Sequence, residues 1–251
     1  MRGYERKNVI LNKLYAEKKV SVKDLSQEFD VSEETIRRDL EKLEKKDIVT
    51  RSYGGAMLND KDDIPYITRH SRNLPQKKAI GKSLLHYIEA GGAIMADSSS
   101  TVHEALKMIA SQHIELNIIT NSVSALNEFA HSSLNIISTG GTLRERSSAL
   151  IGPITTETIQ RFNADIALVS CKAISMDGVS DANDVESATK KVMINQSKKV
   201  ILIVDSTKFN HDSFVKMIEF ADIDILITDQ LPSDEWRVFL KEHQIEVIES
   251  N

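Results

Sequence analysis

Seven short aliphatic runs between residues 93 and 249 constrain the fold of this chain more than any other feature. They span residues 93–97, 116–120, 134–139, 165–170, 199–205, 222–228 and 245–249. Strands that are apolar along their whole length are buried on both faces, as in parallel sheets. Helix-length amphipathic segments separate most of the runs, which predicts an α/β domain with a doubly wound, mostly parallel sheet.

A polar segment before this domain divides the chain in two. Residues 59–75 contain two of the four prolines and are predicted to form a linker. Helical spacing resumes at Ala79 and Ile80 and stops at Gly91. The predicted domains are therefore residues 1–58 and residues 76–251.

The composition argues against several classes of protein. Hydrophobic residues make up 41% of the chain, so it can bury a core, yet no apolar run approaches the ~18 residues that cross a membrane. The first residues lack the apolar region of a signal peptide, so we expect a cytoplasmic protein without membrane contact. The single cysteine, Cys171, has no partner for a disulfide or a zinc-binding thiol pair. Because neither a metal-binding histidine spacing nor a glycine-rich nucleotide loop is present, we expect no metal and no cofactor.

Residues 1–58 have the pattern of a winged helix-turn-helix domain. The apolar spacing and the capping residues predict helices at about 5–18, 22–29 and 33–46, and two short strands within 47–58. Gly54 and Gly55 supply the hairpin turn between these strands. Ser32 is a good N-cap for the third helix, and the two glutamates that follow suit the positive end of the helix dipole.

The third helix is predicted to read DNA. Ile36, Leu40 and Leu43 form one apolar stripe, so the first turns present their other side chains outward. Arginine can bond guanine edges or phosphates in the major groove, threonine can contact a thymine methyl, and glutamate can accept from cytosine. The residues predicted to contact DNA, including two on the wing, are Ser32, Glu34, Thr35, Arg37, Arg38, Arg51 and Tyr53.

The charge distribution agrees with this assignment without deciding it. Residues 1–58 carry 13 basic and 11 acidic side chains, whereas the remaining residues carry 19 and 26, so the net charges are +2 and −7. A basic excess attracts polyanions, but an excess this small is more often ordinary solvated surface. Capped amphipathic helices are also common, so the order of the elements and the outward arginine pair carry the prediction.

Polar residues follow four of the predicted strands. Ligands of open α/β sheets bind beyond the carboxyl ends of the strands, where hydroxyls and free N–H groups at helix starts make phosphate sites. Lysines supply counter-charge there, while carboxylates can bond sugar hydroxyls. The alternative is that these residues only cap helices and form turns. The candidate residues at the strand ends are Asp97, Ser98, Ser99, Ser100, Thr101, Asn121, Ser122, Gly140, Gly141, Asp205 and Lys208.

The N-terminal residues resemble the DeoR family of bacterial transcriptional regulators. The positions that match the family signature are Arg6, Ile10, Leu14, Ser32, Thr35, Ile36, Arg37, Arg38, Asp39 and Leu40, followed by Arg51, Tyr53, Gly54, Gly55 and Ala56. The resemblance extends to the sensor domain, in the sequences DSSST, TNS, GG and DSTKF that begin at residues 97, 120, 140 and 205, and in residues 186–193. It implies a repressor of carbohydrate-metabolism genes whose C-terminal domain has a sugar-phosphate-isomerase-like fold.

The same resemblance implies the effector and its site. A phosphorylated sugar is expected near Ser98 to Thr101, with Lys208 or Lys190 nearby and Glu186 in the site. The chain departs from the family at Ser99 and Ser100, where Gly and Thr are usual, and at Ala173, which replaces a glycine. The backbone near Ser99 is therefore expected to approach a phosphate less closely. Because one recognition helix covers a half-site, a homodimer or homotetramer that binds operator DNA is also expected.

Two enzymatic alternatives remain open. Asp97, Asp177, Glu186 and Lys190 are candidates for an acid/base set that isomerises a sugar phosphate. Cys171 would be a nucleophile if a base lay nearby, although a lone cysteine after a buried strand is more often a small core residue. The regulator hypothesis, by contrast, requires no catalytic residue.

Overall fold

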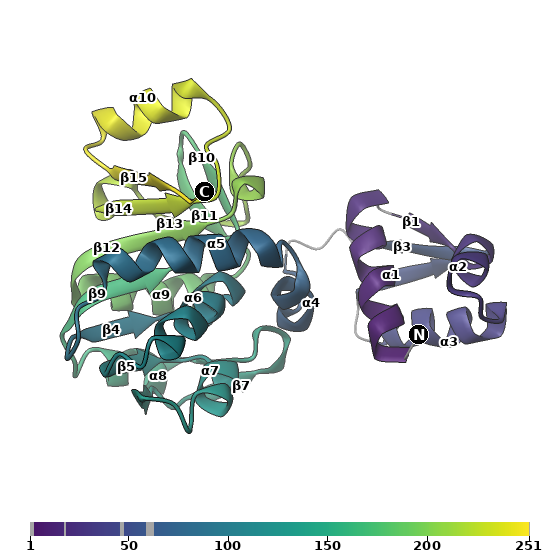
Figure 1. The fold of residues 1–251 in the computed structure, drawn as a ribbon, viewed down its shortest axis with the longest axis horizontal. Coiled ribbons are helices and arrows are strands. Elements are labelled where there is room, and N and C mark those ends of the chain that lie inside the picture. The colour runs from purple at the N-terminus through teal and green to yellow at the C-terminus, as the bar shows by residue number, and fades with distance from the viewer. Residues whose placement is uncertain (1–2, 18, 46–47, 59–62, 251) are drawn as a thin grey trace. The chain divides into compact units, whose positions relative to one another are not determined.

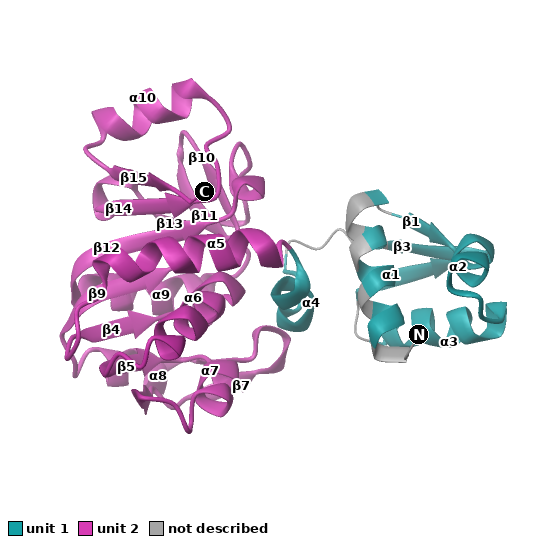
Figure 2. Cartoon of the chain, in the orientation of Figure 1, with its two compact units in different colours: residues 1–72 teal, residues 73–251 magenta. Residues whose placement is uncertain are grey.

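The computed structural model describes residues 3–17, 19–45, 48–58 and 63–250, and the chain divides into two compact units, residues 1–72 and 73–251 (Figure 2). The N-terminal unit is a winged helix-turn-helix. Its elements are α1 (Gly3–Glu17), β1 (Lys19–Ser21), α2 (Val22–Phe29), α3 (Glu33–Glu44), β2 (Val49–Ser52) and β3 (Gly55–Leu58). Ile10, Leu25, Ile36 and Leu40 are buried in one core among the three helices. The predicted helices and hairpin are present. Residue 18 at the end of the first predicted helix, residue 46 at the end of the third, and residue 47 at the start of the predicted hairpin segment lie outside the described residues.

The strand β1 was not predicted. It pairs with β3, so the antiparallel sheet has the order β1-β3-β2. Three residues are too few for an alternating pattern to be recognised in the sequence. Gly55 permits the pairing, because a Cβ atom at that position would lie 2.1 Å from the carbonyl oxygen of Val20.

The predicted linker, residues 59–75, contains helical structure. A short helix, α4 (Tyr66–Ser71), lies inside it, and α5 (Leu74–Leu84) begins before its end, while residues 59–62 lie outside the described residues. The prolines that suggested a linker stand at the starts of these helices, Pro65 just before α4 and Pro75 in the first turn of α5. Proline is favoured there because its missing N–H would be unpaired in any case.

The C-terminal unit is built on a seven-stranded parallel sheet (Figure 1). Its strands are β4 (Ala93–Ala96), β5 (Leu116–Thr120), β6 (Leu134–Ser138), β9 (Ala164–Val169), β12 (Ser197–Val204), β14 (Ile225–Thr228) and β15 (Glu246–Glu249). These are the seven predicted runs. The run at 222–228 forms a strand only from Ile225, because residues 220–222 make a 3-10 turn in which Asp222 accepts a hydrogen bond from the Glu219 amide.

Helices cover both faces of the sheet, so the doubly wound architecture is confirmed. The helices α5, α6 (Ser100–Ser111) and α7 (Val123–Glu128) pack on one face, where Ile94 is buried. On the other face, Met95 packs with residues of α8 (Pro153–Ile159) and α9 (Asp184–Asn195), and α10 (Asp234–Glu242) contributes Trp236. Adjacent residues of one strand thus enter different cores, as the alternation of side chains along a strand requires.

Two smaller sheets were missed by the sequence prediction. They are the hairpin of β7 (Thr142–Arg144) with β8 (Ala149–Ile151), and the sheet of β10 (Ala173–Ser175), β11 (Gly178–Asp181) and β13 (Val215–Ile218). Strands of three or four residues with mixed polarity give no recognisable period.

The strand order locates the point where the direction of winding reverses. The order is β15-β14-β12-β9-β4-β5-β6, so the chain moves outward from β4 to β6 and then returns to form β9 beside β4. In open α/β sheets the ligand crevice lies beyond the carboxyl ends of the strands at this reversal. A ligand site is therefore expected among the residues that follow β4 and β9.

Candidate DNA interface and candidate ligand site

The start of α3 is organised by Ser32. Its hydroxyl accepts a hydrogen bond from the Thr35 amide at 3.2 Å and lies 2.9 Å from the Thr35 hydroxyl. Glu33 and Glu34 occupy the first turn, where their negative charges interact favourably with the positive end of the helix dipole. Ser32 therefore sets the beginning of the predicted recognition helix, and the Thr35 hydroxyl is bound to it in this structure.

Arg37 and Arg38 are exposed on α3, but each is held by a glutamate. The Arg37 guanidinium lies 2.6 Å from Glu33 and the Arg38 guanidinium lies 3.3 Å from Glu34, both at an i,i+4 spacing. Exposed pairs of this kind stabilise a helix by only about 0.3–0.5 kcal/mol. The two glutamates therefore hold these exposed arginines only weakly.

The wing, which is the hairpin of β2 and β3, presents Tyr53 and is attached to α3 through Arg51. Tyr53 is fully exposed beside Gly54, whose φ of 89° makes the turn between β2 and β3. The Arg51 guanidinium donates to Glu44 at the end of α3 at 2.6 Å, and its backbone amide donates to the same carboxylate. These two hydrogen bonds lower the pKa of Glu44. Arg51 thus ties the wing to α3, in addition to the DNA contact predicted for it.

An ion pair inside the N-terminal unit explains two positions of the signature. Arg6 of α1 contacts Asp39 of α3 at 2.7 Å, and both side chains are buried. Sequence reasoning matched these residues as a motif without assigning them a role. The pair joins the first helix to the face of α3 opposite Arg37 and Arg38.

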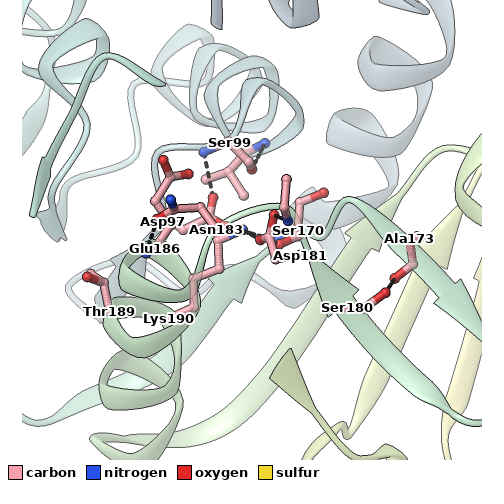
Figure 3. Close-up of polar contacts among 12 residues, drawn as sticks. Asp97, Ser99, Ser170, Ala173, Ser180, Asp181, Asn183, Glu186, Thr189 and Lys190 are labelled. Carbon is pink, nitrogen blue, oxygen red and sulfur yellow. Dashed lines mark hydrogen bonds and ion pairs between the residues drawn. The ribbon is translucent and has the colours of Figure 1, made fainter. Parts of the chain in front are cut away.

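The second candidate site lies beyond β4, where Asp97 organises the turn into α6. One of its oxygens accepts from the Ser99 amide at 2.8 Å, and the other accepts from the Ser170 amide, after β9, at 3.1 Å (Figure 3). Ser99 is the N-cap of α6, since its hydroxyl accepts from the Val102 amide at 3.3 Å. Its φ of −74° is ordinary for any residue, so the position does not require the glycine usual in the family.

Lys190 connects this turn to the rest of the unit. It extends from α9, is buried, and lies 3.2 Å from Asp97, 2.8 Å from the Ser170 carbonyl oxygen and 2.5 Å from Asp181 of β11 (Figure 3). Burial lowers the pKa of Lys190, but Asp181 and Asp97 outweigh burial and hold that pKa above its usual value. Lys190 is therefore charged and fully engaged in the network of Lys190, Asp97 and Asp181.

Glu186 is also engaged. Its carboxylate lies 2.7 Å from the guanidinium of Arg144 on β7. Its backbone amide donates a hydrogen bond to the side-chain oxygen of Asn183 at 3.1 Å. Arg144 also donates to Ser147 at 3.2 Å. The contact joins the first turn of α9 to the β7–β8 hairpin and was not predicted.

Residues after β5 and β6 lie at the same carboxyl edge of the sheet. Asn121 donates to the Leu150 carbonyl at 3.0 Å, whereas its buried side-chain oxygen has no hydrogen-bond partner among the described residues. Ser122 caps α7 by accepting from the Ala125 amide at 3.2 Å. Gly140 and Gly141 both have positive φ, and a Cβ atom at Gly141 would lie 2.1 Å from the Thr155 hydroxyl. Close packing against α8 thus accounts for Gly141 without a ligand.

Asp205, after β12, faces the start of α5. It accepts hydrogen bonds from the Thr207 amide at 3.2 Å, from the Thr207 hydroxyl, and from the Asn73 side chain at 2.9 Å. Burial raises the pKa of Asp205, but Lys208, Thr207, Lys77 and Asn73 together outweigh burial and lower that pKa below its usual value. Asp205 is therefore a charged acceptor, with Lys208 close enough to act on its charge.

Lys77 also lies at this edge and was not predicted. It lies on the buried stripe of α5 with Ile80, Gly81 and Leu84, is 3% exposed, and donates to the Ser100 hydroxyl at 3.0 Å. A lysine on an apolar stripe is rarely buried without a partner, and this spacing was the available signal. Ser98 and Thr101 are buried beside Ser100 in the same turn.

Several alternatives lose support. Burial raises the pKa of Cys171 to about 12, so its thiol is a poor nucleophile at neutral pH. Asp177 is exposed on the turn between β10 and β11. Ala173 lies on β10, not in a loop, and pairs with Ser180 in the β10–β11 register (Figure 3), so no glycine is needed. Among the described residues, no group of histidine, cysteine and acidic side chains has the arrangement of a metal site, and no helix is long and apolar enough to span a membrane.

Comparisons with known proteins cover nearly the whole chain. The profile of the DeoR C terminal sensor domain matches residues 72–230, and that of the DeoR-like helix-turn-helix domain matches residues 6–62. The uncharacterized HTH-type transcriptional regulator YulB of Bacillus subtilis is 36% identical over 90% of this chain and 88% of its own length. The glycerol-3-phosphate regulon repressor of Escherichia coli is 30% identical over 98% of this chain and 99% of its own. Ribose 5-phosphate isomerase A of Methanocaldococcus jannaschii aligns with a TM-score of 0.41 at 12% identity, over 55% of each chain.

Proposed function

Because the chain belongs to the DeoR family of transcriptional regulators, we propose that it represses carbohydrate-metabolism genes and that a phosphorylated sugar controls its affinity for operator DNA. Repression is supported by the name of the glycerol-3-phosphate regulon repressor, which aligns over almost its entire length. The protein acts in the cytoplasm, where it has access to the chromosome.

The observation that carries the DNA-binding part is the outer surface of α3. Arg37 and Arg38 are exposed in the first half of a capped helix, while Ile36, Leu40 and Leu43 are buried behind them. The first turns of such a helix enter the major groove, where arginine pairs with guanine edges or phosphates. Ser32, Glu34, Thr35, Arg51 and Tyr53 are proposed to flank this contact.

The effector part is supported by two features of the carboxyl edge of the sheet. The 12-residue helix α6 begins at the buried Ser100, and Lys77 lies within 3.0 Å of its hydroxyl. A helix start with a lysine beside it suits a phosphate. The side-chain oxygen of Asn121 is buried without a described partner, and a sugar hydroxyl is a suitable donor for it. We therefore assign the phosphate to the Ser98–Thr101 turn and the sugar hydroxyls to Asn121 and Asp205.

The isomerase alternative is not favoured by the geometry. An acid/base set needs groups that exchange protons near neutral pH. Lys190 is charged and engaged by two aspartates, Glu186 is paired with Arg144, and Asp177 is exposed on a separate turn. The four candidate groups therefore do not form a catalytic set, and we propose that the protein is not an enzyme.

A dimer or tetramer is proposed from the geometry of DNA reading. One recognition helix covers about half of an operator, so tight and specific binding requires at least two copies of the chain. The C-terminal unit is the proposed site of assembly. Light scattering of the full chain, with and without operator DNA, measures the number of copies.

A thermal-shift screen of phosphorylated sugars tests the effector proposal. A compound that stabilises the parent protein should stabilise the Lys77→Ala and Ser100→Ala variants less, because both residues lie at the proposed phosphate position. Lys198→Ala is the matched control, since Lys198 is exposed and pairs with Asp165 near the amino ends of the strands. Equal shifts for all four proteins would place the compound elsewhere. Turnover of a sugar phosphate that is lost in Glu186→Gln would support the isomerase instead.

A further inference from the structure

Asn73 is the first residue of the C-terminal unit, and its backbone has an unusual conformation. Its φ is 51° and its ψ is 37°, the left-handed region that few non-glycine residues adopt. The preceding residue, Arg72, is the last of the N-terminal unit. A residue in the left-handed conformation therefore joins the two units, and asparagine adopts this conformation more readily than most other non-glycine residues.

The side chain of Asn73 shows what holds it. It does not cap α5, although Asn73 occupies the N-cap position. Its amide instead donates to Asp205 at 2.9 Å and to the Thr207 hydroxyl at 3.1 Å. Both acceptors belong to the turn after β12, which is part of the proposed effector site.

The first turn of α5 makes a second contact with this site. Lys77 donates to the Ser100 hydroxyl at 3.0 Å, at the start of α6. The residue that contacts the turn after β12 and the residue that contacts the turn after β4 are therefore four positions apart in the sequence. The first turn of α5 thus contacts both the proposed hydroxyl end and the proposed phosphate end of the site.

The rest of α5 is fixed against its neighbours. A Cβ atom at Gly81 would lie 3.0 Å from the Cα of Ala105 on α6, so the two helices are in close contact there. Ile80 and Leu84 are fully buried in the core that α5 and α6 form with the large sheet. Movement of α5 as a whole would disrupt this packing, so a change at the site acts on the first turn.

We propose that Asn73 couples the effector site to the DNA-binding unit, an inference that rests on the proposed sugar-phosphate control. The Asn73 amide donates to the Oδ1 atom of Asp205, which also accepts from Thr207, so a sugar hydroxyl that donates to this oxygen competes with Asn73. Once released, Asn73 leaves the left-handed conformation, and the path of the chain between the units changes. Operator affinity then falls, and operator DNA weakens ligand binding by the same factor.

A double-mutant cycle tests this without any ligand. Asn73→Gly removes the amide but keeps the left-handed conformation accessible, and Asp205→Ala removes its acceptor. The DNA is a duplex that the full-length parent selects from a random-sequence library. Each single variant is expected to bind this duplex at least threefold more weakly than the parent. The double variant should bind no more weakly than whichever single variant has the lower affinity. Unchanged affinity in Asn73→Gly, or a loss of affinity in the double variant equal to the product of the two single losses, would overturn the proposal.

A ligand arm separates this inference from the proposed function. The probes are ribose 5-phosphate, glucose 6-phosphate and glycerol 3-phosphate. A probe that stabilises the parent should lower its duplex affinity, whereas it should still stabilise Asn73→Gly and change the duplex affinity of that variant by less than twofold. A parent-like response in Asn73→Gly would refute the coupling role. Silence from all probes in the parent would count against the proposed effector class, and the ligand-free cycle would still decide the coupling.

Two further variants control for structural damage. Asn135→Ala removes an amide that hydrogen-bonds Asn117 on the sheet, and it should behave as the parent in both arms. Asn73→Asp keeps the side-chain size and places a carboxylate against Asp205, so it should weaken duplex binding as Asn73→Gly does. All variants are compared by melting temperature, and a parent-like melt with altered duplex affinity supports coupling over misfolding.

Discussion

Arg6 lies 2.7 Å from Asp39 with both side chains more than nine-tenths buried, so α1 and the proposed recognition helix α3 are joined by an ion pair inside the core of the N-terminal unit. Removing one partner of a buried pair leaves an uncompensated charge and costs about 3–5 kcal/mol. Arg6→Ala should therefore lower the free energy of unfolding of this unit by about that amount. Urea unfolding of the full chain, followed by circular dichroism, measures the loss. Arg38→Ala, which removes an exposed arginine, should change stability by less than about 0.5 kcal/mol.

Arg37 and Arg38 should contribute directly to operator binding. Replacing either with Ala is expected to cost about 1–3 kcal/mol of specific binding if the side chain reads a base. A gel shift at fixed salt concentration measures this cost with the duplex selected by the parent. Lys198→Ala removes one positive charge from the C-terminal unit and serves as the control. Parent-like affinity in both arginine variants would rule out α3 as the recognition helix.

Glu33 and Glu34 should have different effects, although each holds an arginine. Glu33→Gln frees Arg37 and removes a negative charge from the exposed surface of α3, so affinity should rise about two- to fivefold on every sequence, since phosphate attraction does not depend on sequence. Glu34→Gln frees Arg38 in the same way, but it also removes the acceptor predicted to meet cytosine. Its gain should therefore vary with the base at one position of the duplex. Binding measured on a set of single-base variants distinguishes the two outcomes.

The charge of Asp205 should stabilise the C-terminal unit in a pH-dependent way. Because the pKa of Asp205 in the folded protein lies below its usual value, its contribution is present above the unfolded pKa of about 3.9 and is lost as pH falls through the folded pKa. Asp205→Asn should therefore melt below the parent at pH 7, and the difference should shrink as pH falls below about 4. A constant difference between the two melting temperatures over this range would show that charge is not the cause.

Cys171 should be protected from thiol reagents in the folded protein. Burial raises its pKa to about 12, whereas an exposed cysteine has a pKa of about 8.5, so little thiolate exists at pH 8.5. Iodoacetamide should modify the native chain at least about a hundredfold more slowly than the urea-unfolded chain. Mass spectrometry follows both reactions, and rapid modification of native protein would show that the thiol is accessible.

The large parallel sheet could be predicted from the sequence because its strands are uninterrupted aliphatic runs. The small strands could not, since β7 and β10 have three residues each, which is too few for a recognisable alternation of polar and apolar side chains. The helices of the N-terminal unit were predicted because Ser21 and Ser32 mark their starts, and both serines are N-caps in the structure. Local signals were thus sufficient wherever the element was long or capped.

The polar residues after the strands were predicted as a group, but their individual contacts were not. Asp97, Lys190 and Glu186 were candidates for ligand contacts, and the structure shows each one bound to another side chain. Their partners Asp181 and Arg144 lie on the small strands that the sequence did not reveal. Asn73 was missed because it lies in the predicted linker, and Lys77 was missed because it precedes the apolar spacing that begins at Ala79.

The network of Lys190, Asp97 and Asp181 also determines which sequence changes this edge of the sheet can tolerate. One ammonium group lies between two carboxylates at the reversal between β4 and β9, and all three side chains are buried. Removing one partner of a buried ion pair leaves an uncompensated charge. A change at any of these three positions is therefore expected to persist in evolution only together with a change at another.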